Sequence, residues 1–232
     1  MAYPYLTMIV AMGYTRQSAA LGLVFFSLYF FLTKRYILSY LTAFAALFFH
    51  KSSAIFLLFL ILVTPWRKRS PFGLLMIAIS LIGLFVLGYQ EIFMRFYSFY
   101  VESQMESEGG TLRAIMNLIP ALGFLFTKRY WNKLLNREQL KVWLVISIIV
   151  LILSSFAVLK LTFGDRLLLY FSVIQFLFFV WIEKLFREIE SKGMIYFAVI
   201  MIYTAALLVW LLFAKHREAW IPYSNLVFEI LK

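Results

Sequence analysis

The chain has 232 residues, of which 64% are apolar and only 14% are charged. A soluble domain of this size could not cover so much apolar surface, because about half of its residues would have to face water, so the composition excludes a water-soluble protein. The formal charge of +11 would suit nucleic acid, but we attribute it to membrane topology and expect no nucleic-acid partner, and the lack of cysteine excludes disulfides and thiolate metal sites.

Eight apolar stretches predict an all-α fold: a polytopic bundle of about eight transmembrane helices forming one integral-membrane domain over residues 1–232. The stretches are continuous and do not alternate with a period of two, which argues against a transmembrane β-barrel. The opening MAYPYLTMIVAM is apolar but too short to span a membrane, so we expect a short interfacial or re-entrant segment there, or the remnant of a helix of a longer protein. The eight stretches cover about 17–33, 36–49, 53–66, 71–88, 114–127, 142–159, 167–182 and 194–214.

The second and third stretches could form one helix, and the basic residues argue for two. With two helices, the loops on one side hold 13 of the 22 basic residues but 4 of the 11 acidic ones. Positive charge concentrates on cytoplasmic loops, so we predict that this side faces the cytoplasm. The cytoplasmic loops are then about 34–35, 67–69, 128–141 and 183–192, and the largest outer loop covers about 89–113.

This topology places a set of polar side chains on the outer side: Arg16, Gln17, His50, Lys51, Arg113, Asp165, Arg166, Lys215, His216 and Arg217. Small residues follow Arg16, which predicts that this face packs inside the bundle and holds the arginine within the protein. The helices flanking His50 are short, so their hairpin is expected to lie below the membrane surface, in a water-filled pocket.

Simpler interpretations stay open for each of these residues. Arginine at a helix end is often a membrane-surface anchor. Asp165 could cap the start of a helix, and His50 could be a buried histidine bonded to backbone.

Several arginines with one histidine and one aspartate favour chemistry on a phosphate ester. The guanidinium fork binds phosphate through two hydrogen bonds and would stabilise a departing diphosphate. His50 or Asp165 could accept a proton from an attacking hydroxyl. No metal ligands or cofactor motif stand out, so we expect neither a metal nor a cofactor.

Four segments carry a family resemblance. GYTRQSAALG (13–22) resembles the G-x-x-R-Q-x-x-A signature of the EpsG-like, Wzy-type polymerases of bacterial exopolysaccharide and O-antigen. LFFHKSSAIFLL (47–58) is similar to the family's F-H-x-S-S-A segment, GDRLLLYF (164–171) to its D-R pair followed by a tyrosine, and WIPYSNLVF (220–228) to its C-terminal P-Y. The family usually has more helices before the R-Q motif, so the chain resembles a short or truncated member.

The resemblance implies a metal-independent glycosyltransferase in the bacterial cytoplasmic membrane. It would transfer a growing chain from polyprenyl diphosphate to the hydroxyl of the next lipid-linked repeat unit, on the extracytoplasmic face. His50 and Asp165 become the catalytic candidates, while Arg16, Arg166 and Arg113 become diphosphate ligands. Gln17 and Tyr223 are supporting candidates. A flippase and a chain-length regulator of the same pathway are the expected protein partners.

Three other functions remain open at this stage. A transporter or flippase for lipid-linked sugars would also use cations, but it should show repeated halves with matching broken helices, which the sequence lacks. A membrane acyltransferase would use His50 as the base, and the arginines would then have a smaller chemical role. An inactive, truncated polymerase would lack a complete site.

Overall fold

The computed structural model describes residues 6, 10, 11, 13–65, 71, 75, 78, 110–158, 162–185 and 192–213. Within these residues the chain is helical and contains no strand, which confirms the all-α prediction. The elements are α1 (Thr15–Leu32), α2 (Tyr36–Phe49), η2 (Lys51–Ser53), α3 (Ala54–Val63), α5 (Gly110–Phe126), α6 (Lys128–Trp131), α7 (Arg137–Val158), α8 (Thr162–Leu168), η5 (Leu169–Phe171), α9 (Val173–Leu185) and α10 (Lys192–Phe213).

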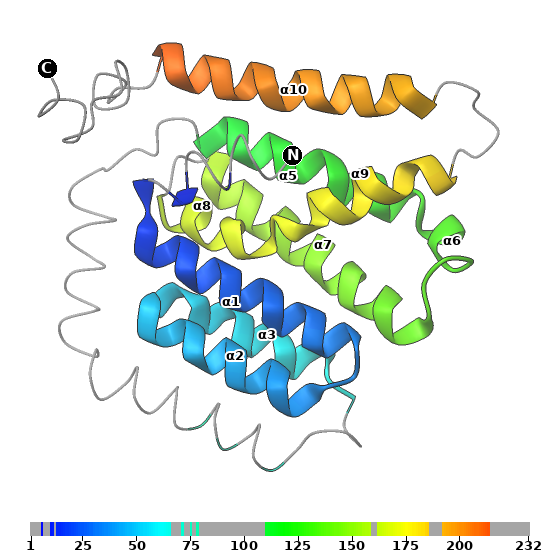
Figure 1. Ribbon diagram of the computed structural model, residues 1–232. Coiled ribbons are helices and arrows are strands. Elements are labelled where there is room, and N and C mark those ends of the chain that lie inside the picture. The colour runs from blue at the N-terminus through cyan, green and yellow to red at the C-terminus, as the bar shows by residue number, and fades with distance from the viewer. Residues whose placement is uncertain are drawn as a thin grey trace, which may run out of the picture.

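The helices form two groups that meet around α8 and η5 (Figure 1). α1, α2 and α3 pack together on one side, and α5, α7 and α9 pack together on the other. Small polar residues let α1 and α2 approach each other, since the Ser27 hydroxyl donates to the Ser39 carbonyl at 2.7 Å between them. Aromatic rings fill the space under η5, where Phe56, Phe59 and Phe171 contact one another.

The predicted division of the second and third apolar stretches is confirmed. α2 ends at Phe49, and His50 has an extended backbone (φ −152°, ψ 119°) that no α-helix accommodates. Lys51–Ser53 forms a short 3₁₀ turn before α3 begins. A hairpin of two short apolar helices therefore places His50 at its tip.

The connection from α1 to α2 lies at the opposite end of the bundle. Lys34 adopts a left-handed conformation (φ 64°), and the amides of Lys34 and Arg35 donate to the carbonyls of Phe31 and Phe30, which ends α1. The start of α7 lies beside this turn, because the Tyr36 hydroxyl donates to Glu138 at 3.4 Å. The two predicted basic connections, 34–35 and 128–141, thus share one end of the bundle, the end at which α2 begins (Figure 1).

Three described helices are long and apolar enough to cross a membrane: Thr15–Leu32, Arg137–Val158 and Tyr196–Phe213. A fourth span results if the bent pair Gly164–Phe171 and Val173–Ile182 is counted as one. Large apolar side chains also face outward, including Phe48 and Phe126, which suits contact with lipid. These features fit a helical membrane protein; the predicted span 71–88 and the predicted loop 67–69 lie mainly outside the described residues, so the count of eight stays a prediction.

The bent pair is the most irregular part of the described bundle. Its two helices meet at 44°, with a 3₁₀ turn and Ser172 between them. The Ser172 hydroxyl donates to the carbonyl of Leu169 at 2.8 Å, and such bonding back to the preceding turn is a common cause of helix bending. Within a membrane, irregular backbone is tolerated where other protein groups satisfy its hydrogen bonds.

Several predicted boundaries are wrong in the same direction. α5 begins at Gly110 and α7 at Arg137, so parts of the predicted loops 89–113 and 128–141 are helical. α9 and α10 likewise extend into the predicted loop 183–192. Helices continue past their apolar portions because polar residues at the ends can reach water or headgroups, so an apolar run marks only the middle of a helix.

Candidate functional site

Side chains from both helix groups meet around the short helix α8, at the end of the bundle that carries His50. Gly164 permits this arrangement, since a Cβ there would lie 2.9 Å from the amide nitrogen of Ala157 and 3.1 Å from the carbonyl of Leu153. α8 therefore lies directly against the backbone of α7. We call the side chains gathered there the α8 cluster: Gln17, His50, Ser52, Arg113, Asp165, Arg166 and Tyr170.

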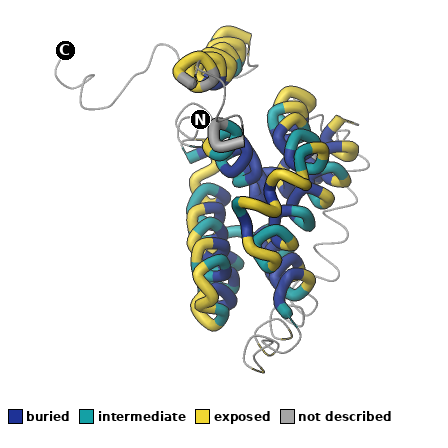
Figure 2. Tube along the Cα trace, turned by 90° about the vertical axis from the view of Figure 1, so that its right-hand side faces the viewer, coloured by how far each residue is buried: buried dark blue, intermediate teal, exposed yellow. Residues whose placement is uncertain are grey.

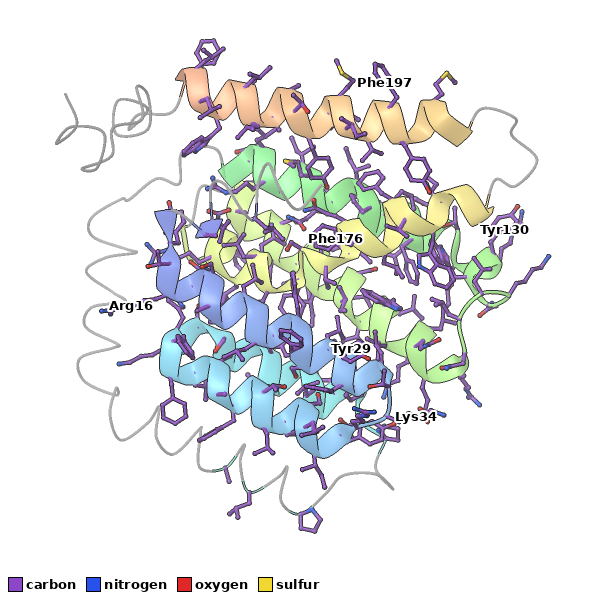
Figure 3. All side chains as sticks on the ribbon, in the orientation of Figure 1. Arg16, Tyr29, Lys34, Tyr130, Phe176 and Phe197 are labelled. Atoms are coloured by element: carbon purple, nitrogen blue, oxygen red, sulfur yellow. The ribbon has the colours of Figure 1, made fainter. Side chains whose placement is uncertain are left out.

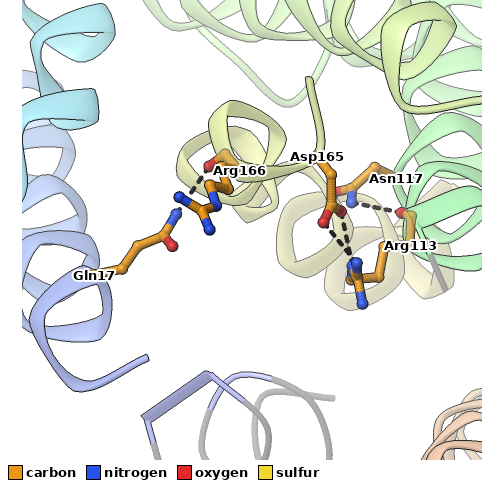
Figure 4. A network of polar contacts seen from close by, with 5 residues as sticks. All are labelled: Gln17, Arg113, Asn117, Asp165 and Arg166. Carbon is orange, nitrogen blue, oxygen red and sulfur yellow. Dashed lines mark hydrogen bonds and ion pairs between the residues drawn. The ribbon is translucent and has the colours of Figure 1, made fainter. Parts of the chain in front are cut away.

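Arg113 and Asp165 form a two-pronged ion pair between α5 and α8 (Figure 4). The Arg113 Nε donates to Oδ1 of Asp165 at 2.7 Å, and one terminal nitrogen donates to Oδ2 at 2.6 Å. The side chains are 17% and 10% exposed, so water screens the pair only partly. Because both carboxylate oxygens accept from one planar guanidinium, the pair fixes the orientation of Arg113.

Gln17 joins α1 to α8 through the backbone of Arg166. Its amide nitrogen donates to the Arg166 carbonyl at 3.0 Å, although 149 residues separate the two in sequence. The last carbonyls of a helix have no donor within the helix, and Arg166 lies in the last turn of α8. Gln17 is buried because it supplies that donor, and the contact anchors the helix that carries Asp165 and Arg166.

His50 belongs to a compact hydrogen-bonded group at the hairpin tip. Its Nδ1 lies 2.6 Å from the Ser52 hydroxyl and 3.3 Å from the Tyr170 hydroxyl, and these two hydroxyls lie 3.0 Å apart. Two partners at Nδ1 orient the ring and leave Nε2 on its other side, the arrangement that positions imidazole as a base. Tyr170 is fully buried and Ser52 half-buried, so the group is anchored to η5.

Burial, and then the positive charge of Arg166, lowers the pKa of His50 below its usual 6.5. His50 lies between two helices and outside the candidate spans. Arg166 is exposed, whereas the other side chains described on α8, residues 164, 165, 167 and 168, are buried. The structure therefore places an accessible guanidinium near a histidine that is neutral at physiological pH.

The predicted site residues do not all come together. His50, Arg113, Asp165, Arg166 and Gln17 belong to the α8 cluster. The prediction that Arg16 is held inside the bundle is wrong, because its side chain is exposed and extends away from the neighbouring helices (Figure 3). Consecutive side chains on an α-helix point about 100° apart around its axis. Burial of Gln17 therefore directs Arg16 outward.

Two groups of predicted residues remain, the Asp165–Arg166 pair and the polar residues near the C-terminus. Asp165 lies in the first turn of α8 and Arg166 in its last turn, so the helix starts at Thr162, ahead of the predicted apolar stretch 167–182. Tyr223, Lys215, His216 and Arg217 lie outside the described residues.

Ser52 and Tyr170 were not predicted as site residues, although the tyrosine of GDRLLLYF belongs to the motif that resembles the family. Both lie within the quoted segments, Ser52 two residues after His50 and Tyr170 one turn after Arg166. The spacing of Tyr170 was a usable signal, since residues four apart on a helix share a face and Tyr170 follows Arg166 by four. Among the described residues, no three of His, Cys, Asp and Glu are grouped so that they could hold a metal ion.

Comparison with known proteins gives a match to a family model. The model described as the EpsG family matches residues 1–225, which is nearly the whole chain. No curated protein and no solved structure matches the sequence.

Proposed function

Because the chain belongs to the EpsG family, we propose that it is a polysaccharide polymerase that joins oligosaccharide repeat units carried on polyprenyl diphosphate. The family is associated with polymerases of the glycosyltransferase type. The observation that carries the proposal is the position of His50 next to Arg166. A neutral proton acceptor near an exposed cation is what transfer from a diphosphate requires.

The proposed reaction exchanges one bond at the sugar for another. A hydroxyl of the incoming repeat unit attacks the anomeric carbon of the growing chain, which is attached to polyprenyl diphosphate. The carbon–oxygen bond to the diphosphate breaks as the new glycosidic bond forms. The hydroxyl proton passes to the enzyme and then to water, and the polyprenyl diphosphate leaves with the bonding electron pair.

His50 is the better candidate for the proton acceptor, and Asp165 is better suited to a supporting role. Both oxygens of Asp165 already accept hydrogen bonds from Arg113. His50 is held through Nδ1, and within the described part of the chain the structure gives Nε2 no hydrogen-bond partner. A histidine with a lowered pKa is uncharged at neutral pH, and in the tautomer whose Nδ1–H donates to the Ser52 hydroxyl its Nε2 can accept the proton.

Arg166 is the proposed main ligand of the diphosphate, with Arg113 as a second, oriented cation. Arg166 is exposed, whereas residues 164, 165, 167 and 168 of α8 are buried, and a guanidinium can donate two hydrogen bonds to a phosphate group. Arg16 lies outside the α8 cluster, so we assign it to the approach of the anionic substrate and not to the departing diphosphate. Gln17 holds α8, and Tyr223 stays a proposed contact for sugar.

The proposed location is the extracytoplasmic face of a bacterial cytoplasmic membrane. The two basic connections that share one end of the bundle support it, because cytoplasmic loops carry excess Lys and Arg. The α8 cluster would then lie at the outer end, where repeat units become available after a flippase has moved them across. A flippase and a chain-length regulator are the proposed partners.

The test uses the purified full chain in lipid nanodiscs, a polyprenyl-diphosphate oligosaccharide and a gel that resolves chain length. The wild type should produce a ladder of joined repeats. His50→Ala should slow joining by about 100-fold or more, the usual contribution of a general base. Arg166→Ala should slow it by a similar factor through loss of leaving-group stabilisation.

Lys51→Ala is the matched control, because Lys51 is an exposed cation next to His50 that lies outside the α8 cluster. It should polymerise like the wild type. A ladder of normal length and rate from both His50→Ala and Arg166→Ala would contradict the proposed site. A wild-type protein that moves the substrate across the bilayer without joining it would instead indicate a transporter.

A further inference from the structure

A line of buried polar side chains leads from the α8 cluster into the apolar interior. The Asn117 amide nitrogen donates to the carbonyl of Arg113 at 2.9 Å (Figure 4). The Gln175 amide nitrogen donates to the Asn117 side-chain oxygen at 2.8 Å, and the Tyr203 hydroxyl donates to the Gln175 side-chain oxygen. The line therefore joins α5, α9 and α10 and ends at the residue that binds Asp165.

Burial of these polar side chains in the apolar interior costs free energy. Asn117 is 2% exposed, and Gln175 and Tyr203 are each 3% exposed. An amide or hydroxyl in an apolar interior costs free energy unless it is hydrogen-bonded, so each of the three depends on its neighbours. Such a network holds its members in one arrangement, because a change at one of them leaves another unsatisfied.

The direction of the hydrogen bonds is set at the Arg113 end. A backbone carbonyl can only accept, so the Asn117 amide nitrogen has to face it and the Asn117 oxygen faces Gln175. Gln175 must then donate through its nitrogen, which leaves its oxygen to accept from Tyr203. All three bonds run the same way, from α10 toward Arg113.

Tyr203 is also one of the few places where α10 contacts the bundle. Among the side chains that the structure describes on α10, Val199 and Tyr203 alone are buried. Figure 2 shows the helix nearly end-on and exposed on most of its surface. The Tyr203 ring packs edge-on against Phe179 of α9, at 6.3 Å between ring centroids. The position of α10 is thus transmitted to α5 through this residue.

α5 lacks one backbone hydrogen bond near Arg113, and the side-chain hydrogen bonds of Asn117 and Gln175 support the helix there. Pro120 lies inside the helix and has no amide hydrogen, so the carbonyl of Met116 loses its usual donor. The segment before Pro120 carries Arg113. The Asn117 side chain adds a bond to the carbonyl of Arg113, and Gln175 holds Asn117 in the orientation that makes it.

We propose that Asn117, Gln175 and Tyr203 are positioning residues that hold Arg113, and through it Asp165, in the geometry used for polymerisation. The catalytic part of this inference rests on the proposed function. The positioning of Arg113 does not rest on that function, because it concerns how well ordered α5 is in the protein without substrate.

The first test is hydrogen–deuterium exchange of residues 110–117 in the full chain without substrate. Tyr203→Phe removes one hydroxyl and should raise the exchange rate of this segment several-fold. Tyr40→Phe is the matched control, since Tyr40 is also buried and its hydroxyl bonds Thr64 at 2.9 Å on other helices. It should leave residues 110–117 unchanged.

The second test is kinetic. Tyr203→Phe and Gln175→Met should each lower kcat by about 10-fold with little change in KM, because misplaced groups lose rate more than binding. The double variant should be no worse than Gln175→Met alone, since both changes break one line of hydrogen bonds. Additive losses would show that the residues act separately and would overturn the proposal.

The two tests separate failure of this inference from failure of the proposed function. If the wild type joins repeats and Tyr203→Phe matches Tyr40→Phe in both exchange and kcat, the positioning role is wrong. If the wild type joins nothing but Tyr203→Phe still loosens residues 110–117, the positioning of Arg113 holds and the polymerase proposal fails.

Discussion

Arg113 and Asp165 lie 52 residues apart in sequence and form the ion pair that joins α5 to α8. Both carboxylate oxygens take part, so the pair fixes the distance and the rotation of one helix end relative to the other. It lies near the start of the apolar helix α5, where a lone charge would be costly. Each residue therefore depends on the other, and the position of Arg166, next to Asp165, depends on both.

The ion pair gives a first prediction about stability. Arg113→Ala and Asp165→Ala should each destabilise the protein by about 3 kcal/mol, because each leaves a partly buried charge without its partner. The double variant should lose less than the sum of the two, by a coupling of about 1–3 kcal/mol. Thermal unfolding in detergent would measure the stability of the wild type, the two single variants and the double variant.

A matched cycle on Tyr36 and Glu138 provides the control, since that contact joins helices at the other end of the bundle. Its longer bond of 3.4 Å predicts a coupling well below that of the ion pair. Full additivity of Arg113→Ala and Asp165→Ala would contradict the structure at this point.

The pH dependence of polymerisation gives a second prediction. Burial and the charge of Arg166 lower the pKa of His50, so the proton acceptor becomes protonated only below the usual 6.5. Activity should be present at neutral pH and be lost as the pH falls through this lowered pKa. Arg166→Gln removes the charge but not the burial, so the acid limb of the pH–rate profile should move to higher pH, toward 6.5.

Lys51→Gln removes a cation that does not contribute to the shift and should leave the acid limb in place. The comparison uses the shape of the profile, so a lower rate in Arg166→Gln does not affect it. An acid limb that stays unchanged in Arg166→Gln would argue against His50 as the acceptor.

The course of the helices was largely predictable from the sequence, and their ends were not. The break at His50 followed from the distribution of Lys and Arg, which depends on how loops lie relative to a membrane. Hydropathy reports the apolar middle of a helix, so the polar first turns of α5 and α7 were assigned to loops. The broken path through η5 was also missed, because LLLYFSV is as apolar as a continuous helix.

Local motifs identified most of the cluster but not its contacts. His50, Asp165 and Arg166 stand out because charged groups are rare in apolar segments. That Asp165 binds Arg113, and that Gln17 binds the backbone of Arg166, depends on how distant helices pack. Arg16 was assigned to the interior because small residues follow it, but consecutive helix residues point in different directions, and Gln17 takes the inward one.

Gly164 supplies a third prediction. Gly164→Ala would push the backbone of α8 away from α7, since the new Cβ would lie 2.9 Å from the Ala157 amide nitrogen. We expect a loss of about 1–3 kcal/mol in stability, the usual cost of overpacking, and slower polymerisation as Asp165 and Arg166 shift. Gly22→Ala is the control, because a Cβ at position 22 would have nothing within 4 Å of it. It should be neutral or stabilise α1 by up to about 1 kcal/mol, and an equal response of the two variants would contradict close packing at Gly164.

The orientation in the membrane gives a fourth prediction, and the absence of native cysteine makes it simple to measure. Lys34 and Lys51 are both exposed, and they lie at opposite ends of α2, Lys34 before Tyr36 and Lys51 after Phe49. In intact cells, a membrane-impermeant maleimide should label Lys51→Cys from outside and should label Lys34→Cys only after the membrane is opened. The pattern follows if the basic connections face the cytoplasm, because translocating their charges is unfavourable. Labelling of Lys34→Cys alone in intact cells would place the α8 cluster on the cytoplasmic side, where repeat units delivered by a flippase could not reach it.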